Sequence, residues 1–317
     1  MMHIEKIEYA GWQDCLRLSN GRIEVIVTTE VGPRILRFGA VGGENLFHEV
    51  PEHRGLTGGT AWRALGGHRL WHAPEVEPRT YAPDNAPVHY EIQPDRVSLI
   101  QKVEPTTGIQ KVMEIRLDPE RDHVQVMHRL TNLNPWSVEL APWALTIMAP
   151  GGVAIVPQEP FAPHPAFKEG PELPGADAYL PVRSMALWSY TRLNDPRWVF
   201  LGRYILTKQD PASPFPLKYG VSNRQQWCGY VRNGELLLKR FAWQAEANYP
   251  DVGCNNEIYT DKNILELESL GPLTTLRPGA SVEHGETWHY FRDVDFSFEE
   301  ASLDAALRPL LASIPMA

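Results

Sequence analysis

Residues 15–47 read CLRLSNGRIEVIVTTEVGPRILRFGAVGGENLF and carry the strongest fold signal in the chain. Asn20-Gly21 separates residues 15–19 (CLRLS), in which apolar and polar residues alternate, from residues 23–29 (IEVIVTT), which are rich in β-branched residues. Asn-Gly supplies the positive φ angles of a two-residue hairpin turn, so we expect antiparallel strands on both sides of it. A second turn at Val31-Gly32-Pro33 leads into Arg34–Phe38, where Ile35 should face one way and Arg34 and Leu36 the other.

The same two-residue period continues through most of the chain. Further strands are predicted at residues 89–93, 97–103, 109–117, 122–130, 198–207, 226–232, 236–241, 264–270 and 287–292, with Asn233-Gly234 as another hairpin turn. One segment, 297–311, has helical spacing of its apolar residues, with Ser297 as N-cap. Many strands without βα alternation predict an all-β protein, a large antiparallel sandwich formed by residues 1–317 as a single domain.

Two segments interrupt the simple alternation. Residues 136–150 are apolar on both faces, which predicts a strand buried between layers. Residues 151–190 are rich in proline, and we expect a long excursion over the surface there.

Composition excludes several classes of protein. The 317 residues are 43% hydrophobic and 22% charged, which is ordinary globular content, and a net charge of −9 gives no attraction for nucleic acid. An apolar run long enough to span a membrane is absent, as is a signal peptide, so we expect a cytoplasmic protein, or a periplasmic or secreted one if a signal sequence was removed. Three scattered cysteines predict buried thiols, and the oligomeric state is left open.

Gly66–Glu75 reads GGHRLWHAPE and gathers two imidazoles, a guanidinium, an indole and a carboxylate. As a strand it places His68, Leu70 and His72 on one face and Arg69, Trp71 and Ala73 on the other. A helix would stack the histidines as a metal pair, but the preceding glycines and Pro74 disfavour a helix, and a third ligand at a diagnostic spacing is missing. No metal is therefore predicted. A buried hydrogen-bonded network and a binding or acid/base site remain open.

Leu265–Leu270 reads LELESL, so Glu266 and Glu268 share one face of a predicted strand. This face is either solvated or lines a cleft, with one glutamate as a general base. The preceding loop, residues 248–260, is rich in groups that bind hydroxyls, including Asp251 and Glu257, although an ordinary turn explains it equally well. Arg34 is either a solvated strand residue or part of a pocket rim. Sequence signatures of nucleotide-binding loops and of serine hydrolases are absent.

Several of these stretches together resemble an uncharacterised bacterial branch of the galactose mutarotase-like (aldose 1-epimerase-like) superfamily. The resemblance runs from about Leu16 to Arg292 and rests on residues 31–39 (VGPRILRFG), 45–47 (NLF), 66–75, 249–251 (YPD), 265–272 (LELESLGP) and 276–279 (LRPG). It implies a β-supersandwich whose concave sheet binds a carbohydrate, without a cofactor. In true mutarotases a late glutamate takes the anomeric proton and a histidine protonates the ring oxygen.

The resemblance implies specific roles for residues of this chain. Glu268 corresponds to the base, with Glu266 next. Trp143 or a neighbour stands where the mutarotase histidine would be, so His68 or His72 would have to supply the acid. The residues expected to position the sugar are Arg34, Arg69, Trp71, Glu75, Trp143, Asp251, Glu257 and Glu266. The expected function is sugar binding with aldose 1-epimerase-like isomerisation. The alternatives are a non-catalytic sugar-binding module and, less favoured, an oligosaccharide lyase or hydrolase.

Overall fold

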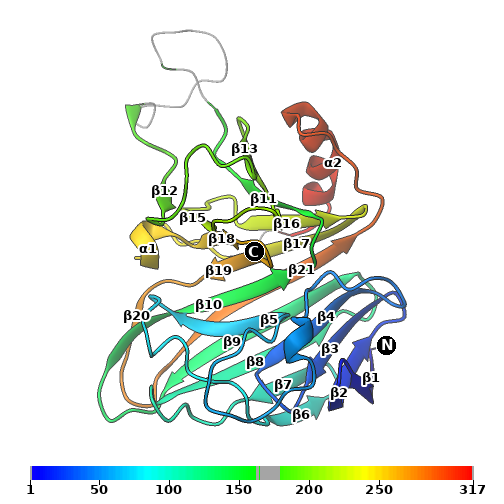
Figure 1. Ribbon diagram of the computed structural model, residues 1–317, viewed down its shortest axis with the longest axis vertical. Helices are drawn as coiled ribbons and strands as arrows, with labels where there is room; N and C mark the ends of the chain where they lie inside the picture. Colours follow the sequence, from blue (N-terminus) through cyan, green and yellow to red (C-terminus); the bar gives the residue numbers. More distant parts are fainter. Residues whose placement is uncertain (1, 162–163, 165–178, 316–317) are drawn as a thin grey trace.

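The computed structural model describes residues 2–161, 164 and 179–315, and it consists of two large antiparallel sheets packed face to face (Figure 1). The first sheet has the spatial order β1 (His3–Tyr9), β2 (Trp12–Ser19), β3 (Ile23–Thr28), β4 (Arg34–Ala40), β5 (His68–Ala73), β10 (Val138–Met148), β19 (Leu265–Leu270), β18 (Asn256–Thr260), β15 (Leu217–Val221) and β12 (Met185–Leu187), and β20 (Thr274–Leu276) pairs with β10. The predicted antiparallel sandwich is confirmed.

The second sheet runs β13 (Trp198–Phe200), β14 (Tyr204–Lys208), β11 (Val153–Pro157), β16 (Trp227–Arg232), β17 (Glu235–Phe241), β21 (Ser281–Phe291), β9 (His123–Asn132), β8 (Ile109–Leu117), β7 (Arg96–Ile100) and β6 (His89–Gln93). The helical elements named among the described residues are η1 (Pro51–His53), α1 (Pro250–Gly253) and α2 (Glu300–Ala312). None of the helices among the described residues is long and apolar enough to cross a membrane.

The Asn20-Gly21 hairpin forms as expected between β2 and β3. The Asn20 side-chain oxygen accepts hydrogen bonds from the backbone N–H groups of Arg22 and Ile23, and Gly21 adopts a φ of 87°. Strand β4 then continues the antiparallel order, so the first sheet is built largely from consecutive hairpins at its N-terminal edge.

The main hydrophobic core lies between the two sheets. Strand β10 sits in the middle of the first sheet, between β5 and β19, and carries apolar residues on both faces: Leu140 and Met148 join the main core, whereas Trp143 and Leu145 pack on the opposite face. This arrangement explains why residues 136–150 show no alternation of polar and apolar residues. The three cysteines are buried and unpaired.

Helix α2 covers the outer face of the second sheet. Its buried residues Leu303 and Leu307 pack in one cluster with Leu236 and Leu238 of β17. The prediction of Ser297 as the N-cap is wrong, because the residue before the helix is Glu299, with extended backbone and no side-chain cap. The backbone N–H of Ser297 instead donates to the Ser302 hydroxyl, which fixes the approach to the helix.

The proline-rich segment 151–190 is not wholly a surface excursion. Its first part forms β11, whose residues Ala154–Val156 are buried between β14 and β16. Residues 162–163 and 165–178 of this segment, which include four of its seven prolines, lie outside the described residues. The chain re-enters the first sheet at the edge strand β12.

Candidate functional site

A cavity of about 770 Å³ opens on the face of the first sheet that points away from the second sheet. We call it the first-sheet cavity. Strands β5, β10, β15, β18 and β19 form its floor, and loops form its walls. Its lining residues are His48, Val50, Pro51, Glu52, Trp62, Ala64, Arg69, Trp71, Glu75, Tyr81, Trp143, Leu145, Tyr190, Pro216, Lys218, Tyr259, Asp261, Asn263, Ile264 and Glu266.

Strand alternation decides which predicted residues reach the cavity. On β5, Arg69 and Trp71 line it, whereas His68, Leu70 and His72 point between the sheets, as the two-residue period predicts. Antiparallel pairing then places side chains from distant parts of the chain in one row: Arg69 pairs with Leu145, Leu145 with Glu268, and Glu268 with Glu257. The floor is therefore a continuous surface across four strands.

An ion pair between Arg69 and Glu266 forms the polar part of the floor. Arg69 Nη1 lies 2.8 Å from Glu266 Oε1, and the guanidinium stacks 4.5 Å above the Trp71 ring. Both side chains are buried. The Arg69 Nε–H has no hydrogen-bond partner among the described residues, so a donor is available to a ligand.

Four aromatic side chains form a wall beside this ion pair. The Trp71 ring centroid lies 5.5 Å from that of Trp62, 5.1 Å from Tyr81 and 5.4 Å from Trp143. The Trp62 indole N–H is buried and has no hydrogen-bond partner in the described part of the chain. Tyr81 donates a short hydrogen bond to Glu75, which fixes that carboxylate at the rim.

Glu268 belongs to this floor row and is fully buried. Its Oε2 accepts hydrogen bonds from the Trp143 indole at 2.7 Å and from the Lys218 ammonium at 3.3 Å. Lys218 also lies 2.9 Å from Glu257 and 4.5 Å above the Trp143 ring. Lys218 and Trp143 line the cavity, whereas Glu268 and Glu257 do not, so the predicted base is reached through these two residues.

Burial and electrostatic repulsion raise the pKa values of the two buried carboxyl groups, Glu257 and Glu268. Burial raises the pKa of Glu257 well above its ordinary value, and Lys218 opposes that shift while Glu268 adds to it. Burial likewise raises the pKa of Glu268 against the opposing effect of Lys218. Burial alone would lower the pKa of Lys218, but the two carboxylates outweigh it and raise the pKa. The single positive charge of Lys218 thus neutralises only one of the two carboxylates, which favours protonation of the other.

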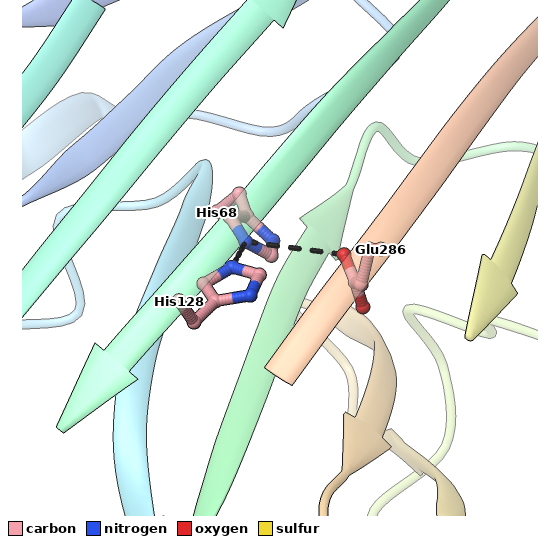
Figure 2. A group of neighbouring side chains, drawn as sticks. All are labelled: His68, His128 and Glu286. Atoms are coloured by element: carbon pink, nitrogen blue, oxygen red, sulfur yellow. Dashed lines mark hydrogen bonds and ion pairs between the residues drawn. The ribbon is translucent and has the colours of Figure 1, made fainter. Parts of the chain in front are cut away.

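The structure places His68 in a polar cluster between the sheets, not in the cavity. His68 and His128 have Nε2 atoms 2.7 Å apart, and His68 Nε2 lies 4.0 Å from Glu286 Oε2. Figure 2 shows the three side chains pointing toward one another from different strands. Their ligand atoms lie within 4.8 Å of one another, a spacing that could hold a metal ion.

The hydrogen bonds of this cluster fit a proton-ordered network better than a metal centre. Lys239 donates to Thr146 Oγ1 at 2.6 Å, Thr146 lies 2.7 Å from His68 Nδ1, and His128 Nδ1 lies 2.9 Å from the His284 carbonyl. If the Thr146 hydroxyl donates to His68, then His68 Nε2–H donates to His128, and each ring nitrogen has a partner. Burial lowers the pKa of both histidines, which keeps them neutral. Lys239 lies 3.1 Å from Glu286 and already neutralises it.

His72 is also remote from Glu268. Its Nε2 lies 3.5 Å from Glu104, which forms a buried ion pair with Lys111 at 2.5 Å. Both histidines therefore occupy the face of the first sheet opposite to Glu268. The prediction that His68 or His72 protonates a sugar beside Glu268 is contradicted by this geometry, because the sheet itself lies between them.

The remaining predicted residues divide into two groups. Arg69, Trp71, Glu75, Trp143 and Glu266 meet in the cavity. Arg34 does not: it is fully buried, donates to the Gly66 carbonyl and to Asp84 at 2.6 Å, and pairs in register with Arg69, so it supports the floor from the side. Asp251 is also absent from the cavity lining, and its carbonyl accepts the Cys254 thiol.

Sequence reasoning missed several residues that line the cavity: His48, Trp62, Tyr81, Tyr190 and Lys218. Four of them, all except Lys218, lie in loops, where no alternation of polar and apolar residues indicates which way a side chain points. Lys218 lies on β15, where a buried lysine cannot be told from a solvated one by pattern alone. His48 is half-buried, and burial followed by repulsion from Arg54 lowers its pKa. Among the described histidines, it alone lines this cavity.

This chain resembles known proteins in its fold but not in its sequence. No family model matches the sequence, and no curated protein matches it. The fold is similar to a candidate aldose 1-epimerase from Klebsiella pneumoniae, with a TM-score of 0.59, 11% identity and coverage of 98% of this chain and 87% of the other. A galactose mutarotase-like protein from Lactobacillus casei aligns with a TM-score of 0.55 and 8% identity over 91% of this chain and all of the other.

A third structure, a TPR-domain containing protein from Parabacteroides distasonis, aligns with a TM-score of 0.56 and 12% identity over 89% of this chain and 48% of the other, so this chain spans about half of that protein. At such low identities these similarities concern the fold. The two sheets, their antiparallel order and the short C-terminal helix show that this chain has the galactose mutarotase-like β-sandwich fold.

Proposed function

We propose that this protein binds a carbohydrate in the first-sheet cavity. The observation that carries the proposal is the aromatic wall of Trp62, Trp71, Tyr81 and Trp143 beside the buried Arg69–Glu266 ion pair, where polar atoms of the floor lack hydrogen-bond partners among the described residues. The cavity volume of about 770 Å³ falls in the range of small-molecule sites.

The two surfaces match the two kinds of surface on a sugar. An indole can cover the apolar C–H face of a pyranose ring. Arg69 Nε–H and Trp62 Nε1–H can donate to hydroxyl oxygens, and Glu266 and Glu75 can accept from hydroxyl groups. The names of the neighbours with this fold, a candidate aldose 1-epimerase and a galactose mutarotase-like protein, support a sugar as ligand.

Binding without turnover is the form of the proposal that the geometry supports best. Anomer interconversion needs an acid and a base that both reach the sugar. His68 and His72 lie behind the sheet, Glu268 lies beneath Trp143 and Lys218, and Glu266 is held by Arg69. A sugar in the cavity would therefore meet donors and acceptors that position it, while the side chains of Trp143 and Lys218 would separate it from the candidate base.

Aldose 1-epimerase activity is the second candidate. One observation favours it: burial raises the pKa of Glu268, as is common for catalytic carboxyl groups. In that case Glu268 would act as the base after Lys218 shifts, and His48 would be the histidine placed to act as the acid.

A thermal-shift and calorimetric screen of common aldoses tests the binding proposal. At a free sugar concentration 100 times Kd, binding should stabilise the folded state by about 2.7 kcal/mol. Glu266→Gln should abolish this stabilisation. Glu283→Gln serves as the control, because Glu283 is a half-exposed carboxylate on β21, away from the cavity. If no sugar binds, or if Glu266→Gln binds as tightly as the wild type, the proposal fails.

The same samples separate binding from turnover. Mutarotation followed by NMR should proceed at the buffer rate in the presence of protein. An accelerated rate that Glu268→Gln removes would establish the epimerase candidate instead.

A further inference from the structure

The outer face of the second sheet carries a row of polar side chains beyond the end of α2. Arg240 on β17 pairs in register with Thr287 on β21, which pairs with Gln125 on β9. The adjacent row on the same face contains His289 of β21 and His123 of β9. This face is remote from the first-sheet cavity, because the entire second sheet and the core lie between them.

Arg240 is exceptional among the buried arginines. Five arginines are buried in the described part of the chain, and four of them pair with a carboxylate: Arg34 with Asp84, Arg37 with Glu24, Arg69 with Glu266 and Arg197 with Asp195. Arg240 is 7% exposed and forms no hydrogen bond or ion pair with any described residue, and its Nε–H is buried and unbonded. A buried cation without a counter-charge is costly, so a missing anion is the simplest explanation.

His289 adds a second unpartnered group at the same place. It is 6% exposed, and its Nε2 has no hydrogen-bond partner among the described residues. Burial first, and then repulsion from His123 and Arg240, lowers its pKa to about 4. The His123 ring centroid is 5.4 Å away, and His123 itself lies 3.5 Å from Asp118. The ring that lacks a partner thus faces a second imidazole and a guanidinium.

Both groups line a cavity of about 660 Å³. Its other charged lining residues are Arg22, Arg121, Glu120 and Asp122, and Asp122 is occupied by Arg22 at 2.5 Å. Three guanidinium groups therefore face two carboxylates, and Arg22 and Asp122 neutralise each other. The two imidazoles have lowered pKa values and are neutral at pH 7, so the lining has one positive charge in excess. This excess of cationic groups contrasts with the net charge of −9 for the whole chain.

We propose that this cavity is a second ligand site, in which Arg240 and His289 bind the oxyanion group, phosphate or carboxylate, of a small anionic metabolite. Arg240 would donate its free N–H groups to the oxyanion, a pairing for which a guanidinium is well suited. His289 Nε2 would take up a proton and become a second donor. Thr287 and Gln125 extend the same row and can bind the uncharged part of the ligand.

The test uses the full chain and inorganic phosphate as probe, with citrate as the carboxylate probe and sodium chloride at matched ionic strength as the control for screening. Phosphate or citrate should bind by calorimetry and should raise the pKa of His289 from about 4, measured by NMR titration of its ring protons. Arg240→Gln should weaken binding at least tenfold. Arg129→Gln, which alters an arginine on the same sheet face already paired with Glu283, should leave binding unchanged.

Stability provides a second readout that does not depend on the choice of anion. Because Arg240 has no partner within the described chain, Arg240→Met should be at least as stable as the wild type in anion-free buffer, and the wild type should gain stability when the anion is added. The proposal is overturned if neither anion moves the His289 titration beyond the chloride control, if Arg240→Gln binds like the wild type, or if Arg240→Met is markedly destabilised without anion.

Discussion

Lys239→Met should destabilise the protein by about 3–5 kcal/mol at pH 7, because it removes the cation that neutralises a buried carboxylate. Lys239 and Glu286 are both fully buried, and Lys239 Nζ lies 3.1 Å from Glu286 Oε2. Methionine preserves most of the apolar stem of lysine, so the loss is chiefly electrostatic.

The remaining partners of Glu286 do not compensate. The Trp288 indole donates to it at 2.7 Å and the Ser269 hydroxyl at 2.5 Å. Two hydrogen bonds to a charged group contribute about 1.5–3 kcal/mol each, which these groups already provide in the wild type. In Lys239→Met the carboxylate must therefore bear its desolvation cost or take up a proton.

The stability deficit of Lys239→Met should depend on pH through the pKa of Glu286. Burial raises the pKa of Glu286, but Lys239, then His128 and His284, outweigh that effect and lower it in the wild type. Wild-type stability from this group is present above the unfolded-state pKa and is lost as the pH falls through the lower folded-state pKa. In Lys239→Met the folded-state pKa is raised, so the deficit relative to the wild type should shrink as the pH falls from 7 to 5.

Equilibrium urea unfolding at pH 7 and pH 5 measures both effects. The double variant Lys239→Met/Glu286→Gln should recover much of the loss, because the unpaired charge is gone. Lys102→Met, at an exposed position, should change stability by less than about 0.5 kcal/mol. A loss below about 1 kcal/mol for Lys239→Met at pH 7, or a deficit that grows as the pH falls, would refute the reasoning.

Two further predictions concern stability away from this cluster. Burial raises the pKa of Glu104, but Lys111 and His72 outweigh that effect and lower the pKa to about 2. Ionised Glu104 therefore contributes on the order of 3 kcal/mol to the free energy of unfolding above its unfolded-state pKa near 4.5, and this stability is lost as the pH falls toward 2. Glu104→Gln should remove that part of the acid dependence in a circular dichroism titration. Leu307→Ala should cost about 2–5 kcal/mol in urea unfolding by opening a cavity under α2, whereas Leu193→Ala, at a side chain 74% exposed, should have little effect.

The period of two predicted which residues of β5 share a face, but it could not assign those faces. His68 and Arg69 are equally polar in sequence, and both faces of β5 are buried. The face that meets the second sheet is set by partners far along the chain, such as His128, 60 positions away, and these pairings leave no local trace in the sequence. The sequence therefore predicted which residues of β5 share a face, but not whether that face meets the second sheet or the cavity.

The same limit applies to Glu266 and Glu268. A solvated sheet face was the simplest interpretation of alternating glutamates, yet both are buried. Each is matched by a cation on another strand, Arg69 for Glu266 and Lys218 for Glu268. Such matching depends on strand order, which single-sequence patterns do not provide.

The two polar faces of β5 also bear on how the chain finds its correct pairing. A shift of β5 by one residue against β10 would exchange the faces, sending Arg69 toward Lys239 and His128 and leaving His68 beside Glu266. In that shifted pairing Arg69 would lose Glu266, and Glu266 would be buried without its cation. Thr146, 78 positions after His68, would lose its imidazole partner at the same time. The polar side chains on both faces of β5 thus make a one-residue register shift costly during assembly of the first sheet, and an apolar strand of equal stability would lack this penalty.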